Sequence, residues 1–121
     1  MKIKVNEASG VVLDLLVSRA GANGGNDGWG WFEFDAEGYL FDPLNECRYS
    51  PSTDWAQGGP ITEREQIATR RSGAYAENFW SASKGFSDDK TYGPTPLIAA
   101  LRCYVASKLG DEVEVPEELC K

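Results

Sequence analysis

The sequence predicts an α+β fold, with a small, mostly antiparallel sheet and two helices in a single domain spanning residues 1–121. Residues 10–20 and 95–109 carry apolar side chains over helical faces, which predicts the two helices. Several shorter segments alternate apolar and polar residues or are rich in aromatic residues, as strands are. The chain has 121 residues, of which 41% are hydrophobic, so it can bury one modest core and leaves little room for a second domain.

Short strands are expected near the N-terminal end. Residues 2–5 alternate Lys-Ile-Lys-Val, which predicts a strand with Ile3 and Val5 facing inward. Aromatic residues dominate residues 29–34 and 39–41, and the Asp-Ala-Glu-Gly between them is a suitable turn. These two segments therefore predict a β-hairpin.

The first predicted helix, residues 10–20, has Ser9 as a suitable N-cap. It is apolar over most of its circumference, and the residues that interrupt this surface are Asp14, Ser18 and Arg19. We therefore expect the helix to be largely buried.

The middle of the chain is expected to alternate loops with strands. Residues 42–60 contain three prolines and several turn-forming residues, which predicts mostly loop with at most one helical turn. Strands are expected at residues 66–70 and 75–82, followed by a polar loop at residues 83–93. Residues 112–115 alternate Glu-Val-Glu-Val, which predicts an edge strand.

The second predicted helix, residues 95–109, has Thr95 as its cap and Pro96 at its first position. One face carries an apolar stripe that should face the core. The opposite face carries small side chains, those of Ala99, Cys103 and Ala106. This small face could accept a close neighbour, so a homo-oligomeric scaffold is one hypothesis for the chain.

The charge of the chain limits its partners. Twelve Lys and Arg residues against 19 Asp and Glu residues give a net charge of −7, which disfavours extended nucleic acid as a partner. An acidic surface suits solubility, or docking on a basic protein. The three cysteines are not a secreted disulfide framework, and the sequence shows neither a signal peptide nor a membrane span. We therefore expect a cytoplasmic protein.

The chain contains no histidine, and this absence restricts its chemistry. It removes Ser-His-Asp and Cys-His catalysis and histidine zinc sites, and three scattered cysteines do not form a thiolate zinc site. We therefore predict no catalytic residues, no metal site and no cofactor, and a protein that is not an enzyme. Carboxylate, lysine or tyrosine chemistry, or magnesium held by carboxylates, stays open.

Residues 49–60 form the most distinctive polar segment, with a Gly-Gly-Pro turn at its end. Trp55 could stack on a base or sugar, while Asp54 and Gln57 could form hydrogen bonds to its edges. Adjacent glycines would let a ligand approach backbone N–H groups. The predicted ligand-binding residues are Tyr49, Ser52, Asp54, Trp55, Gln57, Gly58, Gly59 and Arg70. The alternative is a structural loop, in which Asp54 or Ser52 caps a turn and Trp55 fills the core.

Arg70 belongs to a second candidate surface. Together with Arg71, Tyr75 and Trp80 it could bind and stack on a small phosphorylated ligand, because the arginine fork holds two phosphate oxygens. Ordinary surface arginines and core aromatics are the alternative.

A third candidate is a pair of carboxylates. On a strand, Glu63 and Glu65 would share one face, with Arg64 on the other. Converging with Asp54, they could hold magnesium or perform acid–base chemistry. A solvated face with weak ion pairs is the alternative.

Three blocks carry a resemblance to a known family. They are residues 2–5 with the helix that follows Ser9, residues 52–61 (STDWAQGGPI), and residues 93–110 (GPTPLIAALRCYVASKLG). In this order, and over about half of the chain, they closely resemble the NinX-like proteins of tailed phages and prophages. Residues 21–48 and 72–92 show no recognisable resemblance, and we interpret them as the variable part.

The resemblance implies a bacteriophage accessory protein acting in the bacterial cytoplasm, and it implies no reaction. Three functions stay open. The chain could be a non-enzymatic binding module that modulates the host or its antiviral defence by sequestering a small nucleotide-like ligand. It could instead mask a host protein through an acidic, aromatic surface. The third reading is a carboxylate- and magnesium-dependent hydrolase of a phosphorylated small molecule.

Overall fold

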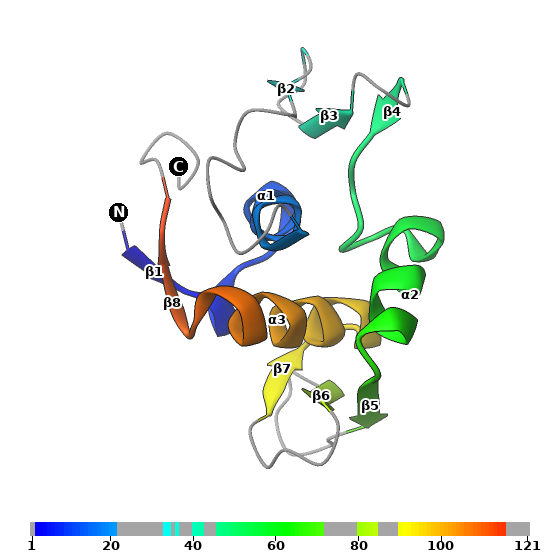
Figure 1. Ribbon diagram of the computed structural model, residues 1–121, viewed down its shortest axis with the longest axis vertical. Helices are drawn as coiled ribbons and strands as arrows, with labels where there is room; N and C mark the ends of the chain where they lie inside the picture. Colours follow the sequence, from blue (N-terminus) through cyan, green and yellow to red (C-terminus); the bar gives the residue numbers. More distant parts are fainter. Residues whose placement is uncertain are drawn as a thin grey trace.

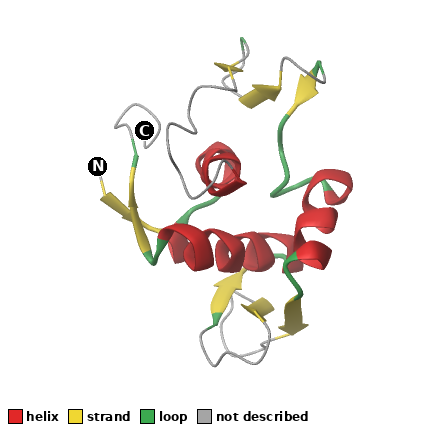
Figure 2. Ribbon diagram, in the orientation of Figure 1, coloured by secondary structure: helices red, strands yellow, loops and turns green. Residues whose placement is uncertain are grey.

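The computed structural model describes residues 2–21, 33–34, 36, 40–42, 46–71, 80–84 and 90–115 (coloured parts of Figures 1 and 2). In chain order the elements of these residues are β1 (Lys2–Lys4), the 3-10 helix η1 (Val5–Glu7), α1 (Gly10–Gly21), β2 (Glu33–Phe34), β3 (Leu40–Asp42), β4 (Cys47–Arg48), α2 (Trp55–Arg64), β5 (Ile67–Arg71), β6 (Trp80–Lys84), β7 (Thr91–Gly93), α3 (Pro96–Leu109) and β8 (Glu112–Glu114). The predicted α+β class is confirmed, with one α-helix more than the two expected.

Helix α3 lies at the centre of the molecule. The sheet β5–β6–β7 packs on one side of it, and α1 and α2 pack on the other sides (Figure 1). The helix begins where the sequence predicts, because the Thr95 hydroxyl accepts a hydrogen bond from the Ile98 N–H at 3.1 Å and Pro96 follows the cap. Its side chains from Leu97 to Val105 are buried, apart from the partly buried Ile98.

The sheet β5–β6–β7 covers the small-residue face of α3. Strand β7 passes so close that a Cβ atom at Gly93 would lie 2.8 Å from the Ala99 nitrogen, and the Thr91 hydroxyl donates to the Ala99 carbonyl at 2.8 Å. The feature that suggested a homo-oligomer is therefore used inside the chain. The strand expected at residues 66–70 is confirmed as β5, whereas the loop expected at residues 83–93 is wrong at both ends, where β6 and β7 lie.

The two remaining sheets are smaller. Strands β1 and β8 pair antiparallel, with Lys2 opposite Glu114 and Lys4 opposite Glu112, so opposite charges face each other across the ladder. This confirms both predicted strands, although Val5 already belongs to η1. Strands β2, β3 and β4 form an antiparallel sheet beside α1 (Figure 1), which confirms the predicted hairpin for residues 33–34 and 40–41. The rest of the predicted hairpin lies outside the described residues, and so do residues 75–79 of the strand expected at 75–82.

The largest departure from the prediction is α2. Residues 42–60 were expected to be mostly loop, because glycine and proline are poor helix formers. The structure instead has helix from Trp55 onward, with Pro60 inside it.

None of the described helices combines the length and hydrophobicity that a membrane span requires.

A buried arginine on α3 joins distant segments. Arg102 is 5% exposed; its Nε donates to the Ala8 carbonyl at 2.8 Å, and a terminal nitrogen donates to the Tyr92 carbonyl at 2.6 Å. The pKa of Arg102 is lowered, because its burial outweighs the opposing effect of the nearby Glu7 carboxylate. The guanidinium thus holds the segment before α1 and strand β7 against the central helix.

Replacing Arg102 by methionine should lower the free energy of unfolding by about 2–4 kcal/mol, because the two carbonyls lose charge-assisted hydrogen bonds in a buried place. Urea unfolding followed by circular dichroism measures this. Arg71→Met, at an exposed position of β5, is the control and should change stability by less than about 0.5 kcal/mol. Equal effects of the two substitutions would contradict the role assigned to Arg102.

Candidate functional site

Most predicted site residues gather at the N-terminal end of α2, where their polar groups are engaged within the chain. Asp54 is the N-cap, and its carboxylate accepts from the Ala56 N–H at 2.9 Å. The Gln57 side chain accepts from the Ser50 N–H at 2.7 Å and donates to the Arg48 carbonyl at 2.8 Å. These two side chains therefore hold the preceding loop against the helix.

Ser52 joins the loop to α1 rather than to a ligand. It is 2% exposed, and its N–H donates to the Asp14 carboxylate at 2.8 Å. The Ser52 hydroxyl is buried and makes no hydrogen bond within the described part of the chain. Burial raises the pKa of Asp14, and the neighbouring side chain and N–H of Ser52 lower it by less.

The two glycines have different structural roles. A Cβ atom at Gly58 would lie 2.6 Å from the Leu97 Cδ1 atom and closer still to the Pro51 carbonyl oxygen, so only glycine lets α2 approach α3. A Cβ atom at Gly59 would lie 3.7 Å from the Trp55 ring, an ordinary contact. Gly59 precedes Pro60, and a residue without Cβ tolerates the helical conformation there.

Trp55 is the one predicted site residue of this segment that faces solvent with its functional group free to bind. It is 55% exposed, and no other large hydrophobic side chain of the described residues is exposed. The alternative in which Trp55 fills the core is therefore wrong. Tyr49 instead packs partly buried against the core, and its N–H donates to the Leu40 carbonyl at 2.8 Å.

The predicted carboxylate pair does not form. Glu63 lies on α2, and Glu65 follows it as the C-cap, at the opposite end of the helix from Asp54. Glu65 has ion pairs with Lys84 at 2.8 Å, Arg64 at 3.2 Å and Lys108 at 3.8 Å. The hydrogen bond from Lys84 is the main reason that the pKa of Glu65 is lowered. The described residues also contain no group of three or more carboxylates or thiols placed to hold a metal ion.

Arg70 lies apart from the Trp55 segment, on the outer face of the sheet. Cross-strand register places Arg70 opposite Ser81 and Arg71 opposite Trp80, so the two arginines face opposite sides. Trp80 packs against the core, which removes it as a stacking partner of Arg70, and Tyr75 lies outside the described residues. A hollow of about 170 Å³ surrounds Arg70, lined by Ala68, Thr69, Arg70, Ser81, Ser83 and Lys90.

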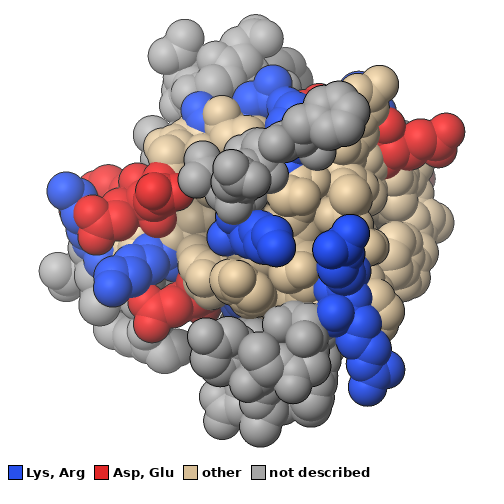
Figure 3. Space-filling model, turned by 90° about the horizontal axis from the view of Figure 1, so that it is seen from below, with Lys and Arg blue, Asp and Glu red and all other residues tan. Residues whose placement is uncertain are grey.

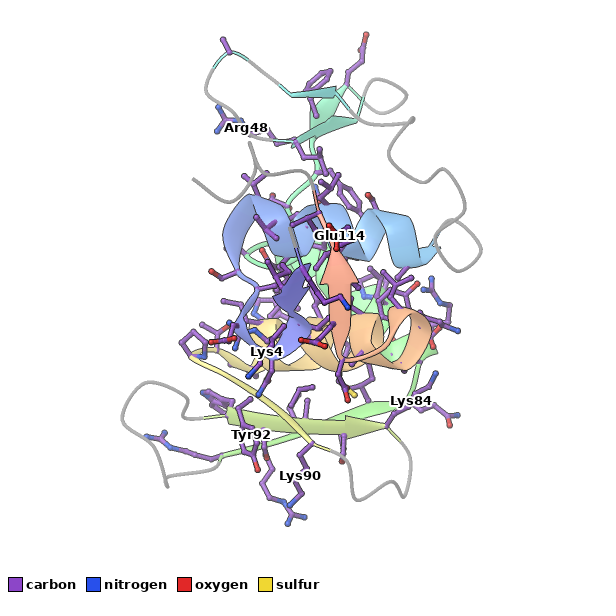
Figure 4. The ribbon with its side chains drawn as sticks, turned by 90° about the vertical axis from the view of Figure 1, so that its left-hand side faces the viewer. Lys4, Arg48, Lys84, Lys90, Tyr92 and Glu114 are labelled. Atoms are coloured by element: carbon purple, nitrogen blue, oxygen red, sulfur yellow. The ribbon has the colours of Figure 1, made fainter. Side chains whose placement is uncertain are left out.

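Lys90 is the binding candidate that the sequence did not reveal. It lines this hollow and also a larger one of about 610 Å³, whose lining residues are Lys4, Val5, Asn6, Lys90, Thr91, Ala106, Asp111 and Glu112. Figure 4 shows Lys90 and Tyr92 on the sheet side of the molecule, with Lys4 nearer β1. The only sequence signal was the Thr-Tyr-Gly that follows Lys90, which is too short for a strand prediction.

The model of the family described as bacteriophage P22, NinX matches residues 4–108, which is most of the chain and includes the α2 and α3 segments. No curated protein matches the chain.

Changing Gly58 to alanine should lower the free energy of unfolding by about 1–3 kcal/mol, because the added methyl group overlaps Pro51 and Leu97. Gly59→Ala is the matched control one position along. It should change stability by less than about 1 kcal/mol, since better helix propensity opposes the restriction before proline. Thermal and urea unfolding measure both variants, and a harmless Gly58→Ala would contradict the close approach of α2 and α3.

Changing Asp14 to asparagine should alter how stability depends on pH. A folded-state pKa above the ordinary value of 3.8 means that the wild type loses stability as the pH rises from that value through the raised pKa. Asparagine keeps the acceptor for Ser52 and has no charge to bury. The variant should therefore gain stability relative to the wild type as the pH rises above the ordinary aspartate value of 3.8.

Urea unfolding at several pH values checks this difference. Asp111→Asn, at an exposed position, is the control for removing one negative charge. A difference curve for Asp14→Asn that is flat, or that slopes the other way, would show that Asp14 does not carry the buried charge inferred for it.

Proposed function

This chain belongs to the bacteriophage P22 NinX family and is a phage accessory protein, and we propose that it acts by binding a protein of the bacterial host through the surface around Trp55. The action proposed is masking by binding alone, without a reaction, in the cytoplasm of the infected cell. The observation that carries the proposal is the 55% exposure of a tryptophan at the start of a helix where the Asp54 and Gln57 side chains are already engaged within the chain.

The surface around Trp55 is fixed before any partner arrives. The Asp54 cap, the Gln57 hydrogen bonds and the close contact of Gly58 hold α2 in place. A rigid tryptophan loses little conformational freedom on binding, and such residues commonly dominate the energy of protein interfaces. Ala56 and Pro60 are also exposed on α2, and they extend the surface with small or apolar groups.

A host protein fits this surface better than a small nucleotide-like ligand does. A ligand that stacks on an indole also needs hydrogen-bonding groups beside it. At this end of α2, the Asp54 carboxylate, the Gln57 amide and the Ser52 N–H are all used internally. An apolar notch on a partner protein requires only the indole face and its N–H.

The partner should carry a basic surface around that notch. The net charge of −7 would attract such a partner at long range and repel acidic competitors. Sequestration of a small phosphorylated ligand is supported by a different observation, the exposed Arg70 in a hollow on the sheet β5–β6–β7. That hollow is a separate place on the molecule.

A photo-crosslinking amino acid at position 56, next to Trp55, should capture one host protein in infected bacteria, and the same amino acid at position 112 on β8 should not. With the captured protein purified, calorimetry should show that Trp55→Ala weakens binding by a factor of about 10 or more. The affinity should also fall as salt is raised, because charge attraction is screened.

Thr53→Ala, in the same loop, is the control and should bind as the wild type does; its hydroxyl makes only a 3.5 Å contact with the Ser50 carbonyl. Capture of a second copy of the chain at position 56, equal capture from both positions, or unchanged affinity of Trp55→Ala would overturn the proposal.

A further inference from the structure

We propose that the outer face of the sheet β5–β6–β7 is a second binding site, in which Arg70 and Lys90 hold the phosphate group of a small phosphate monoester. The site is independent of the Trp55 surface, since the two lie on different elements and on different sides of α3 (Figure 1). The hollow of about 170 Å³ between these two cations has the size of a phosphate group with a few waters.

Both cations are free to bind an anion. Arg64, Lys84 and Lys108 share the carboxylate of Glu65, whereas Arg70 and Lys90 have no carboxylate partner among the described residues. Among the residues that the structure describes, no Asp or Glu lines the hollow either. On the face seen in Figure 3, Lys and Arg side chains stand on uncharged surface at the centre and right, and Asp and Glu lie toward the edges.

The pairing of the strands fixes the positions of the groups. In the antiparallel register Arg70 is opposite Ser81 and Ala68 is opposite Ser83, so these side chains share one face of β5 and β6. Lys90 enters from the start of β7, whose next residue, Thr91, is opposite Ala82. A site built on paired strands keeps its geometry better than one built on a loop.

The hydroxyl groups complete the set of donors. The Ser81 hydroxyl donates to the Arg70 carbonyl at 3.4 Å, which leaves the Ser83 hydroxyl on the same face for a ligand. The arginine fork can donate to two phosphate oxygens at once, and lysine adds a compact charge. A dianionic phosphate monoester uses this arrangement more fully than a monoanion does.

The larger hollow determines what the phosphate can be attached to. It shares Lys90 with the phosphate site, and its volume of about 610 Å³ is in the range of small-molecule sites. Asp111 and Glu112 line it, and their carboxylates would accept hydrogen bonds from hydroxyl or amino groups and repel a second phosphate. The favoured ligand therefore has one phosphate and a neutral, hydrogen-bond-donating body, as a nucleoside monophosphate has.

Titration of the full chain with adenosine and guanosine monophosphates, followed by ¹H–¹⁵N nuclear magnetic resonance, tests the site. Saturable shifts should appear at residues 69–70, 81–83 and 90–91. Arg70→Gln and Lys90→Gln should each weaken binding by a factor of about 10. Inorganic phosphate should bind more weakly at the same residues, and the nucleosides without phosphate should not bind there.

Arg71→Gln is the matched control, because it removes the same charge from the opposite face of β5. Trp55→Ala is the second control, and both should bind as the wild type does. Equal weakening by Arg71→Gln, shifts confined to other residues, or no saturable binding of either monophosphate would overturn the site. Inorganic phosphate that binds as tightly as the monophosphates would overturn the assignment of the larger hollow. None of these results depends on the host-protein interface.

Discussion

The two hydrogen bonds from the Arg102 guanidinium are the interaction on which the arrangement of the molecule depends. They bring the Ala8 carbonyl, 94 residues away in sequence, and the Tyr92 carbonyl to the same turn of α3. Through Ala8 they fix the start of α1, and through Tyr92 they fix β7. Because Lys90 is only two residues before Tyr92, the hollow on the outer face of the sheet also depends on this buried cation.

A second set of buried contacts decides which part of α2 faces solvent. The Asp14 carboxylate holds the Ser52 N–H from the side of α1, and Gly58 fits against Leu97 from the side of α3. With the helix held between these points, Trp55 at its first turn has no surface of the chain left to cover it. The exposure of the indole is thus a result of how α2 is anchored, and a residue involved in that anchoring affects the candidate interface from a distance.

The sequence predicted the elements whose own side chains decide their structure. The apolar stripe and the Thr95-Pro96 cap predict α3, alternation predicts β1 and β8, and the family resemblance is confirmed by the match to residues 4–108. Helix α2 was missed because its Gly-Gly-Pro has low propensity, and tertiary contacts at Gly58 overcome this. In the candidate site, the residue type alone indicated that Asp54 caps a turn. The exposure of Trp55 and the position of Lys90 near Arg70 could not be predicted, because they depend on packing between distant segments.

The position of α3 along the chain has a consequence for biosynthesis. Most of the other elements pack on this helix, yet it is made after α1, α2 and all three strands of the sheet below it (Figure 1). While the ribosome is still translating the preceding residues, these elements have no common surface to bury their apolar faces. The core can therefore form only late, when residues 96–109 emerge, and β1 must wait longer still for β8. Such long-range pairing slows folding, and it leaves the apolar faces of the earlier elements exposed in the nascent chain until α3 is available.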